Sequence, residues 1–138
     1  MNDISAVPDF EEIPHKADAA IIVYGRTMPE LFSHAALGMY HILGFKDESH
    51  GKSEDAIVLE APDAETMLVS FLTELLFLAE KGIKVEVSKI EINNNILRAK
   101  INKRCYQGLS NVIKAVTFNE MKIIKENKIF QTKIVFDL

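Results

Sequence analysis

Residues 15–25, HKADAAIIVYG, decide how the chain begins to fold. Their core is a short apolar run with β-branched residues that ends at Gly25, which is typical of a buried β-strand. One carboxylate, Asp18, stands at the entrance of this strand. A lone acid there is usually a solvated turn residue. The alternative is half of a metal site, whose other half comes from elsewhere in the chain.

Capping signals and apolar spacing predict two helices. Thr27, followed three residues later by Glu30, forms a capping box with a proline in the first turn, and this helix ends at Gly44. A second helix is expected between Pro62 and Gly82. Its apolar residues recur at three- and four-residue spacing, so one face is expected to be buried.

The rest of the chain is predicted to form strands. FEEIPH is a short first strand, and AIVLEA is another that follows a polar loop at residues 45–55. Apolar and polar residues alternate in VEVSKIEI and again in ILRAKI, on either side of an NNN turn, which predicts a hairpin. A short loop at Gln107-Gly108 is expected to follow the hairpin. NVIKAVTFNEMKII and KIFQTKIVFDL form the last two strands, with a turn at Glu126-Asn127. The predicted fold class is α+β, with two helices packed on a mostly antiparallel sheet.

Length and composition favour one soluble domain. With 138 residues, we expect a flexible lead-in at residues 1–8 and a single domain at residues 9–138. Cys105 is the only cysteine, which excludes an internal disulfide and fits a reducing compartment. The N-terminus lacks a signal-peptide pattern, and no apolar run approaches the roughly 20 residues of a membrane span, so a cytoplasmic location is expected.

Charge and motifs exclude several function classes. The net charge of -4 argues against a protein that grips nucleic acid unaided, although such a chain can still serve a nucleic-acid enzyme. Phosphate-binding loops, H-E-x-x-H and the G-x-S-x-G elbow are all missing from the sequence. His34 and His41 share a helix face but lie two turns, or roughly 10 Å, apart, which is too far to hold one ion directly.

The last strand ends with a second carboxylate, Asp137. If the apolar parity of the last strand faces the helices, Leu138 anchors the chain end and Asp137 points to the polar face. Several oxygens then converge near the terminal carboxylate, which suits hard cations such as Mg²⁺ or Ca²⁺. From the pattern alone, an exposed Asp137 on a frayed terminus is the favoured interpretation.

Two further charged residues lie in apolar surroundings. Lys114, in IKAVTF, either extends its side chain past a sheet edge to water or is placed for a partner, and the pattern does not separate these two interpretations. Glu74, in FLTELLF, fits the solvent-facing stripe of the second helix better than a functional role.

Together these stretches resemble the archease family. That family begins with an H-T-A-D block and a strand ending in Y-G, found here as HKAD and IIVYG. Lys16 stands in place of the family threonine, and Asn119 in place of a family histidine. The other blocks follow in family order: TMPELFSHAALGMY for T-x-x-E-x-F-x-x-A-A, FLTELLFL for a W-L-N-E-L-L-like core, IKAVTFNEM for V-K-A-V-T-Y-H, and FDL for F-D-I.

The resemblance implies a non-catalytic cofactor protein of an RtcB-type RNA ligase. Archeases promote guanylylation and multiple turnover of that ligase in tRNA splicing and RNA repair. By the same resemblance, Asp18 and Asp137, with a backbone or terminal oxygen of Leu138, bind a divalent metal (Mg²⁺, Mn²⁺ or Ca²⁺), and Lys114 contacts the partner. The fold resembles a strand-helix-strand-strand module elaborated into an α+β sandwich.

A second hypothesis comes from a different class, a metal-independent protein-binding or chaperone-like module. Lys16, a cation beside the proposed metal site, favours it slightly. A stand-alone metal-dependent hydrolase fits poorly, because two carboxylates and a chain terminus make a sparse site with no apparent general base.

Overall fold

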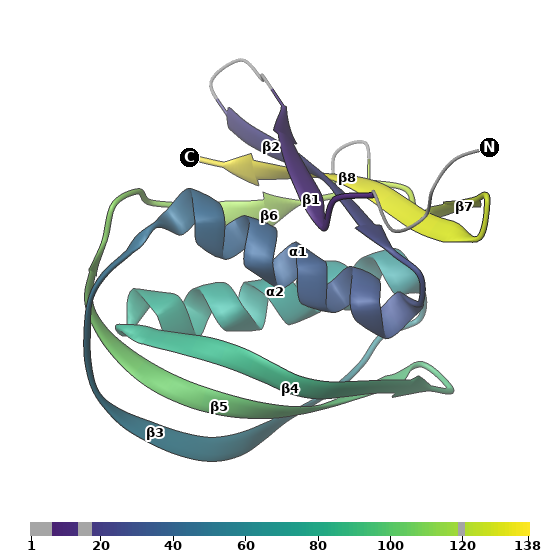
Figure 1. Cartoon of the computed structure of the whole chain (residues 1–138). Helices are drawn as coiled ribbons and strands as arrows, with labels where there is room; N and C mark the ends of the chain where they lie inside the picture. The colour runs from purple at the N-terminus through teal and green to yellow at the C-terminus, as the bar shows by residue number, and fades with distance from the viewer. Residues whose placement is uncertain (1–6, 14–17, 119–120) are drawn as a thin grey trace.

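The protein, seen in a computed structural model, has two helices between two antiparallel sheets (Figure 1). The structure describes residues 7–13, 18–118 and 121–138, without the side chains of residues 47–50, so most of the lead-in predicted at residues 1–8 lies outside it. The described elements are β1 Phe10–Ile13, β2 Asp18–Gly25, α1 Met28–Leu43, β3 Phe45–Glu60, α2 Ala64–Glu80, β4 Ile83–Asn93, β5 Ile96–Leu109, β6 Ala115–Thr117, β7 Ile124–Glu126 and β8 Ile129–Asp137.

The predicted α+β class is confirmed, but the sheet is divided in two. One sheet has the order β1-β2-β8-β6, with β7 also pairing with β8, and the other has the order β3-β5-β4. Every described strand pairing is antiparallel. The helices pack against each other, with the rings of Phe32 and Phe71 5.9 Å apart, and each sheet covers one side of the helix pair. Neither described helix is long and apolar enough to cross a membrane.

The polar stretch at residues 45–55 is the first part of β3, so the predicted loop there was wrong. β5 continues past the loop predicted at Gln107-Gly108 and pairs with this stretch, starting with Phe45 opposite Leu109. The pairing is irregular between Glu48 and Lys52. β3 is an edge strand, and its polar residues lack the apolar alternation by which a strand is recognised in sequence.

The strand predicted at residues 111–124 is interrupted. Among its described residues, β6 and the start of β7 are the only strand segments. Just before β7, the backbone N–H of Ile123 donates to Oε2 of Glu65, in the first turn of α2, at 3.0 Å. That donor is therefore bound to a helix terminus instead of a neighbouring strand. Asn119, which stands where the family has a histidine, lies outside the described residues.

The predicted helix ends and the NNN turn are present, and the last hairpin turn lies at Asn127-Lys128, one residue past the predicted Glu126-Asn127. Oγ1 of Thr27 accepts from the backbone N–H of Glu30 at 3.1 Å, and α1 ends before Gly44, which has φ 61°. The turn residues Asn94, Asn95, Asn127 and Lys128 all have positive φ, which is the geometry of tight two-residue hairpin turns. Local turn chemistry therefore fixes both hairpins.

The cap of α2 gives a pH-dependent contribution to stability. The Asp63 carboxylate accepts from the backbone N–H of Thr66 at 2.7 Å, which holds the pKa of Asp63 below its ordinary value of 3.8. A folded-state pKa below the unfolded one stabilises the fold above about pH 3.8, and this contribution is lost as the pH falls through the folded-state pKa. We expect the stability gap between the wild type and Asp63→Asn, measured by urea unfolding, to be larger at pH 7 than at pH 2.5.

A neutral cap provides the control for this prediction. Thr27→Ser changes the α1 cap without adding or removing an ionisable group, so its stability gap from the wild type should be the same at both pH values. An Asp63→Asn gap that does not change with pH would contradict the assignment of the charge to the cap.

Candidate functional site

Asp18 and Asp137 are directly opposite each other in neighbouring strands. Asp18 opens β2, Asp137 closes β8, and the antiparallel register pairs the two residues. Their neighbours Ala19 and Phe136, also paired, are buried in the core against the helices. Because side chains alternate along a strand, Asp18 and Asp137 are on the outer face of the sheet. The sequence argument placed Asp137 on that polar face, and the register adds Asp18 beside it.

The register places two carboxylates directly opposite each other, where a bound cation would offset the repulsion between like charges. Residues directly opposite in an antiparallel pair have Cβ atoms about 4.5–5.5 Å apart, and like charges there are destabilising. Asp18 is partly buried and Asp137 is exposed. Carboxylate and backbone oxygens are the donors that Mg²⁺, Mn²⁺ and Ca²⁺ prefer, so the donor set fits a hard divalent cation.

The donors at this edge are few. Within the part of the chain that the structure describes, no group of three or more His, Cys, Asp and Glu residues could hold a metal ion. The described candidates are thus two carboxylates and nearby main-chain oxygens, a set that leaves positions for water or for groups of a partner. His15 and Lys16, which precede Asp18, lie outside the described residues.

Leu138 does not anchor the chain end as the strand pattern predicted. Thr132, Ile134 and Phe136 are buried in keeping with that pattern, but Leu138 is 41% exposed. The reason is that the β2–β8 ladder ends at the pair Asp18 and Asp137, so Leu138 extends past the last paired residue of the sheet. The backbone oxygens of Leu138 remain beside Asp137, and its side chain lines a pocket.

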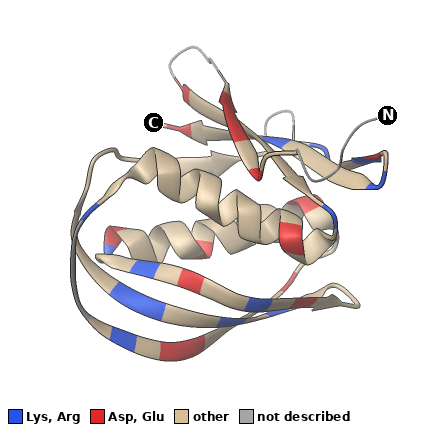
Figure 2. Cartoon of the chain, in the orientation of Figure 1, with Lys and Arg blue, Asp and Glu red and all other residues tan. Residues whose placement is uncertain are grey.

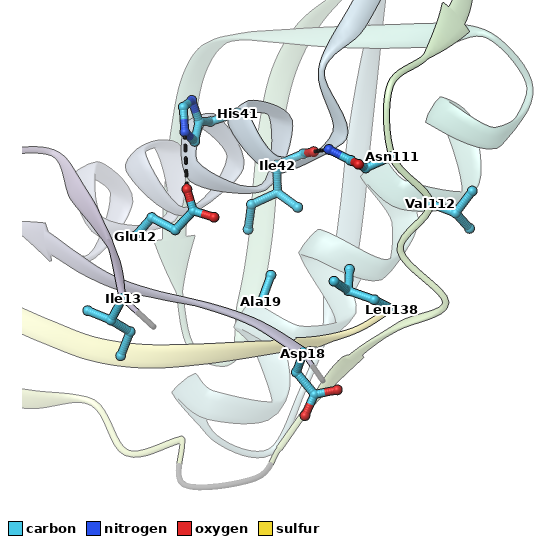
Figure 3. Close-up of a pocket in the computed structure, with 9 residues that line it drawn as sticks. All are labelled: Glu12, Ile13, Asp18, Ala19, His41, Ile42, Asn111, Val112 and Leu138. Carbon is cyan, nitrogen blue, oxygen red and sulfur yellow. Dashed lines mark hydrogen bonds and ion pairs between the residues drawn. The ribbon is translucent and has the colours of Figure 1, made fainter. Parts of the chain in front are cut away.

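This pocket, of about 630 Å³, lies between the β1 and β2 ends, the C-terminal part of α1 and the chain end (Figure 3). His41 Nε2 lies 3.4 Å from a Glu12 carboxylate oxygen, and Asn111 donates to the Ile42 carbonyl at 2.7 Å. In Figure 3 the Asp18 carboxylate points away from His41 and Ile42. Asp18 therefore stands at the edge of the pocket. The lining residues are Glu12, Ile13, Asp18, Ala19, His41, Ile42, Asn111, Val112 and Leu138.

Lys114 is tied to this edge through its backbone. Its N–H donates to the carbonyl oxygen of Asp137 at 2.7 Å, just before β6 pairs Ala115 with Asp137. The Lys114 residue itself is exposed. The sequence did not reveal this contact, because a main-chain hydrogen bond leaves no signal in the pattern of side chains. Three separate chain segments thus meet at Asp137.

His34, His41 and Glu74, which the sequence analysis also considered, lie outside the Asp18–Asp137 pair. His34 Nδ1 lies 2.7 Å from the Tyr24 carbonyl oxygen, which requires an N–H at that nitrogen, and Nε2 lies 3.6 Å from Asp9. His34 and His41 therefore face different acids and do not share an ion. Glu74 is exposed on α2, which confirms the solvent-stripe interpretation.

Comparison with known proteins gives a consistent result. A sequence model of the archease protein family matches residues 10–138. The archease of Methanosarcina mazei is 30% identical over 94% of this chain and 95% of its own length. The archease of Thermococcus kodakarensis is 32% identical over 84% of this chain and 88% of its own.

Two solved structures are similar to this fold. The solution structure of Methanobacterium thermoautotrophicum protein 1598 has a TM-score of 0.71 and 27% identity, and the match covers 94% of this chain and 99% of that one. The crystal structure of a Thermotoga maritima protein described as an archease and possible chaperone has a TM-score of 0.69 and 22% identity. That match covers 93% of this chain and 96% of the other, and at this identity it shows the fold.

Proposed function

Since this chain belongs to the archease family, we propose that it is a non-catalytic accessory protein of an RtcB-type RNA ligase. In this role it promotes guanylylation and multiple turnover of the ligase in the cytoplasm, during tRNA splicing and RNA repair. The observation that carries the proposal is the pairing of Asp18 with Asp137 at one exposed edge of a chain that matches the family from residue 10 to residue 138.

We propose that Asp18 and Asp137, with an oxygen of Leu138, hold a divalent cation for the ligase. When bound, such an ion neutralises charge on phosphate oxygens during phosphoryl transfer. The chain's own contribution is to position the oxygens. The β2–β8 register sets the spacing of the two carboxylates, and the Lys114 hydrogen bond fixes the Asp137 carbonyl. The exposed Lys114 side chain then contacts the ligase or a phosphate.

The basic test is a turnover assay. A limiting amount of ligase is incubated with excess RNA ends, guanosine triphosphate and metal, with and without this chain. We expect more RNA molecules joined per ligase molecule when the chain is present, and a larger guanylylated fraction of the ligase. Equal turnover with and without the chain would contradict the proposal.

The alternative is a metal-independent protein-binding or chaperone-like module. The description of the Thermotoga maritima relative as a possible chaperone supports this alternative. Both hypotheses involve a protein partner and no catalysis by this chain, so the metal is what separates them.

Calorimetric titration of the isolated chain with Mg²⁺, Mn²⁺ or Ca²⁺ separates the two hypotheses. We expect saturable binding that falls at least tenfold in affinity in Asp18→Asn, because the substitution removes one of two anionic ligands while keeping the side-chain size. Glu126→Gln, an exposed acid on β7, is the matched control and should bind like the wild type. No binding at millimolar metal would favour the metal-independent module.

A further inference from the structure

The chain between β5 and β6 joins the C-terminal end of α1 to the Asp137 end of the candidate site. We call residues 110–114 the connecting segment; none of them belongs to a described strand. Within it Ile113 is buried in the core, whereas Val112 is 72% exposed and lines the pocket beside Asp18. The segment is held at both of its ends, and the two attachments connect a helix terminus with the carboxylate pair.

At its first end, the connecting segment supplies hydrogen-bond donors to α1. The last carbonyl groups of a helix have no partner within the helix. The Ser110 N–H lies 2.9 Å from the Leu43 carbonyl oxygen and 2.8 Å from that of Gly44, and the Asn111 N–H donates to Leu43 at 3.0 Å. The Asn111 side chain adds a third carbonyl, because its Nδ2 donates to the Ile42 oxygen at 2.7 Å (Figure 3).

The contact with the helix end is also close. Gly44, the C-cap of α1, has φ 61°, and a Cβ at this position would lie 2.9 Å from the Cβ of Ser110. Two neighbouring residues of the segment, Ser110 and Asn111, are therefore seated directly on the last turn of α1. The Asn111 amide is the one side-chain group among these attachments to the helix.

At its other end, the connecting segment is bound to the candidate site. The Lys114 N–H donates to the Asp137 carbonyl oxygen at 2.7 Å, and the next residue, Ala115, is paired with Asp137. Asn111 and Lys114 are three residues apart, which is at most about 11 Å of chain. Ile113 between them is 1% exposed, so the core holds the middle of this short path. A shift at Asn111 is therefore expected to reach Lys114.

The position of Lys114 matters because it is a cation beside acids. Figure 2 shows acidic residues at the start of β2 and at the end of β8, where Asp18 and Asp137 are paired. A lysine ammonium group repels a metal ion that two carboxylates attract, and both effects depend on distance. The place of the Lys114 backbone thus affects the charge at the site as well as the Asp137 main chain.

We propose that Asn111 is a positioning residue for the cation site. Its amide ties the connecting segment to the last turn of α1, and the segment fixes Lys114 and the backbone of Asp137. This inference rests on the proposed function, because it assigns Asn111 a role toward the cation held by Asp18 and Asp137. A residue that only capped α1 would stabilise the helix and leave metal affinity unchanged.

The first test follows hydrogen exchange of the Lys114 amide by NMR, in the isolated chain without metal. In Asn111→Ala the protection of this amide should fall about fivefold, the effect expected when one hydrogen bond that holds the segment is lost. Asn111→Asp keeps the side-chain size but has no N–H, and should have the same effect. The amide of Ala61, which donates to the Asn95 carbonyl at the hairpin of the other sheet, should exchange at the wild-type rate.

The second test measures affinity for Mn²⁺ by calorimetry, at a temperature where every variant is folded. Asn111→Ala should bind about fivefold more weakly than the wild type. Asn102→Ala is the matched control, because it also removes a side-chain amide, one that donates to Oγ of Ser88 at 3.1 Å in the other sheet. The control should bind Mn²⁺ within twofold of the wild type.

The two measurements distinguish the possible failures. If the wild type binds Mn²⁺ and Asn111→Ala binds it equally well, Asn111 only caps α1 and the positioning role is overturned, while the cation site stands. Unchanged protection of the Lys114 amide in both Asn111 variants would also overturn that role. If the wild type binds no Mn²⁺ at millimolar concentration, the cation site itself fails, and with it the role assigned to Asn111.

Discussion

Replacing Asp137 with alanine is expected to lower the number of RNA molecules joined per ligase molecule at least tenfold, toward the value for the ligase alone. The substitution removes one of the two paired carboxylates and with it the cation of the proposed site. A metal ion contributes several kcal/mol to stabilising charge in a transition state, and each 1.36 kcal/mol is a factor of ten in rate. The measurement is multiple-turnover RNA joining with limiting ligase and excess accessory protein.

The structure makes this variant easy to interpret. Asp137 is exposed at the end of β8, and its backbone hydrogen bond with Lys114 does not involve the side chain. The variant should therefore fold like the wild type. Glu126→Gln, an acid of the same sheet on β7, should stimulate the ligase fully. Unchanged turnover with Asp137→Ala would remove Asp137 from the mechanism.

Measuring metal affinity beside ligase stimulation shows which part of the proposal fails if the expected result is not found. If Asp137→Ala loses metal affinity but still stimulates the ligase, the accessory role stands and the metal has no part in it. If neither the wild type nor the variant stimulates the ligase, the accessory role itself fails. The metal-independent alternative predicts equal stimulation by both proteins and no saturable metal binding.

The candidate site could be predicted only in part from strand patterns. Alternation in the last strand placed Asp137 on the outer face, because Ile134 and Phe136 of that strand are buried. Alternation does not specify which residue lies opposite, since Asp18 is more than a hundred residues away and strand register depends on the whole ladder. The resemblance to the family joined the two acids. The same alternation predicted wrongly that Leu138 anchors the chain end, because alternation contains no information about where the neighbouring strand ends.

The fold shows a similar division. Caps and tight turns are local, and Thr27, Gly44 and Asn127 mark their ends correctly. The division into two sheets is not local. It depends on β3 pairing with β5 and not with β2 or β8, and the first part of β3 is a polar edge segment with little alternation. Both helices bury many residues, because helices covered by sheets on two sides need more than one narrow apolar stripe.

Replacing Gly25 with alanine is expected to destabilise the fold by about 3 kcal/mol, at the upper end of the range for overpacked sites. A Cβ at this position would lie 2.4 Å from the backbone N and 2.7 Å from the Cα of Leu31. These are backbone atoms in the first turns of α1, so the contact cannot be relieved by a change of rotamer. The end of β2 and the start of α1 must separate, and His34 holds them together through the carbonyl of Tyr24.

A second glycine provides the control. A Cβ on Gly108 of β5 would meet nothing within 4 Å, and its φ is not positive. Gly108→Ala should therefore be neutral or stabilising by about 0.5–1 kcal/mol, since glycine within a strand has an entropic cost. Urea unfolding of the two variants measures the difference directly. Equal stability of the two variants would contradict the argument that Gly25 is required by a close backbone approach.

Gly25→Ala also separates the stability of the fold from metal binding. Gly25 and Asp18 lie at opposite ends of β2, with the buried pairs Ala19–Phe136 and Ile21–Ile134 between them and fixed to β8. A shift where β2 meets α1 should therefore leave the register at Asp18 and Asp137 intact. At a temperature where Gly25→Ala is still folded, we expect calorimetry to give its metal affinity within twofold of the wild-type value. A parallel loss of stability and affinity would instead mean that the carboxylate pair depends on how α1 is seated, and not on the β2–β8 ladder alone.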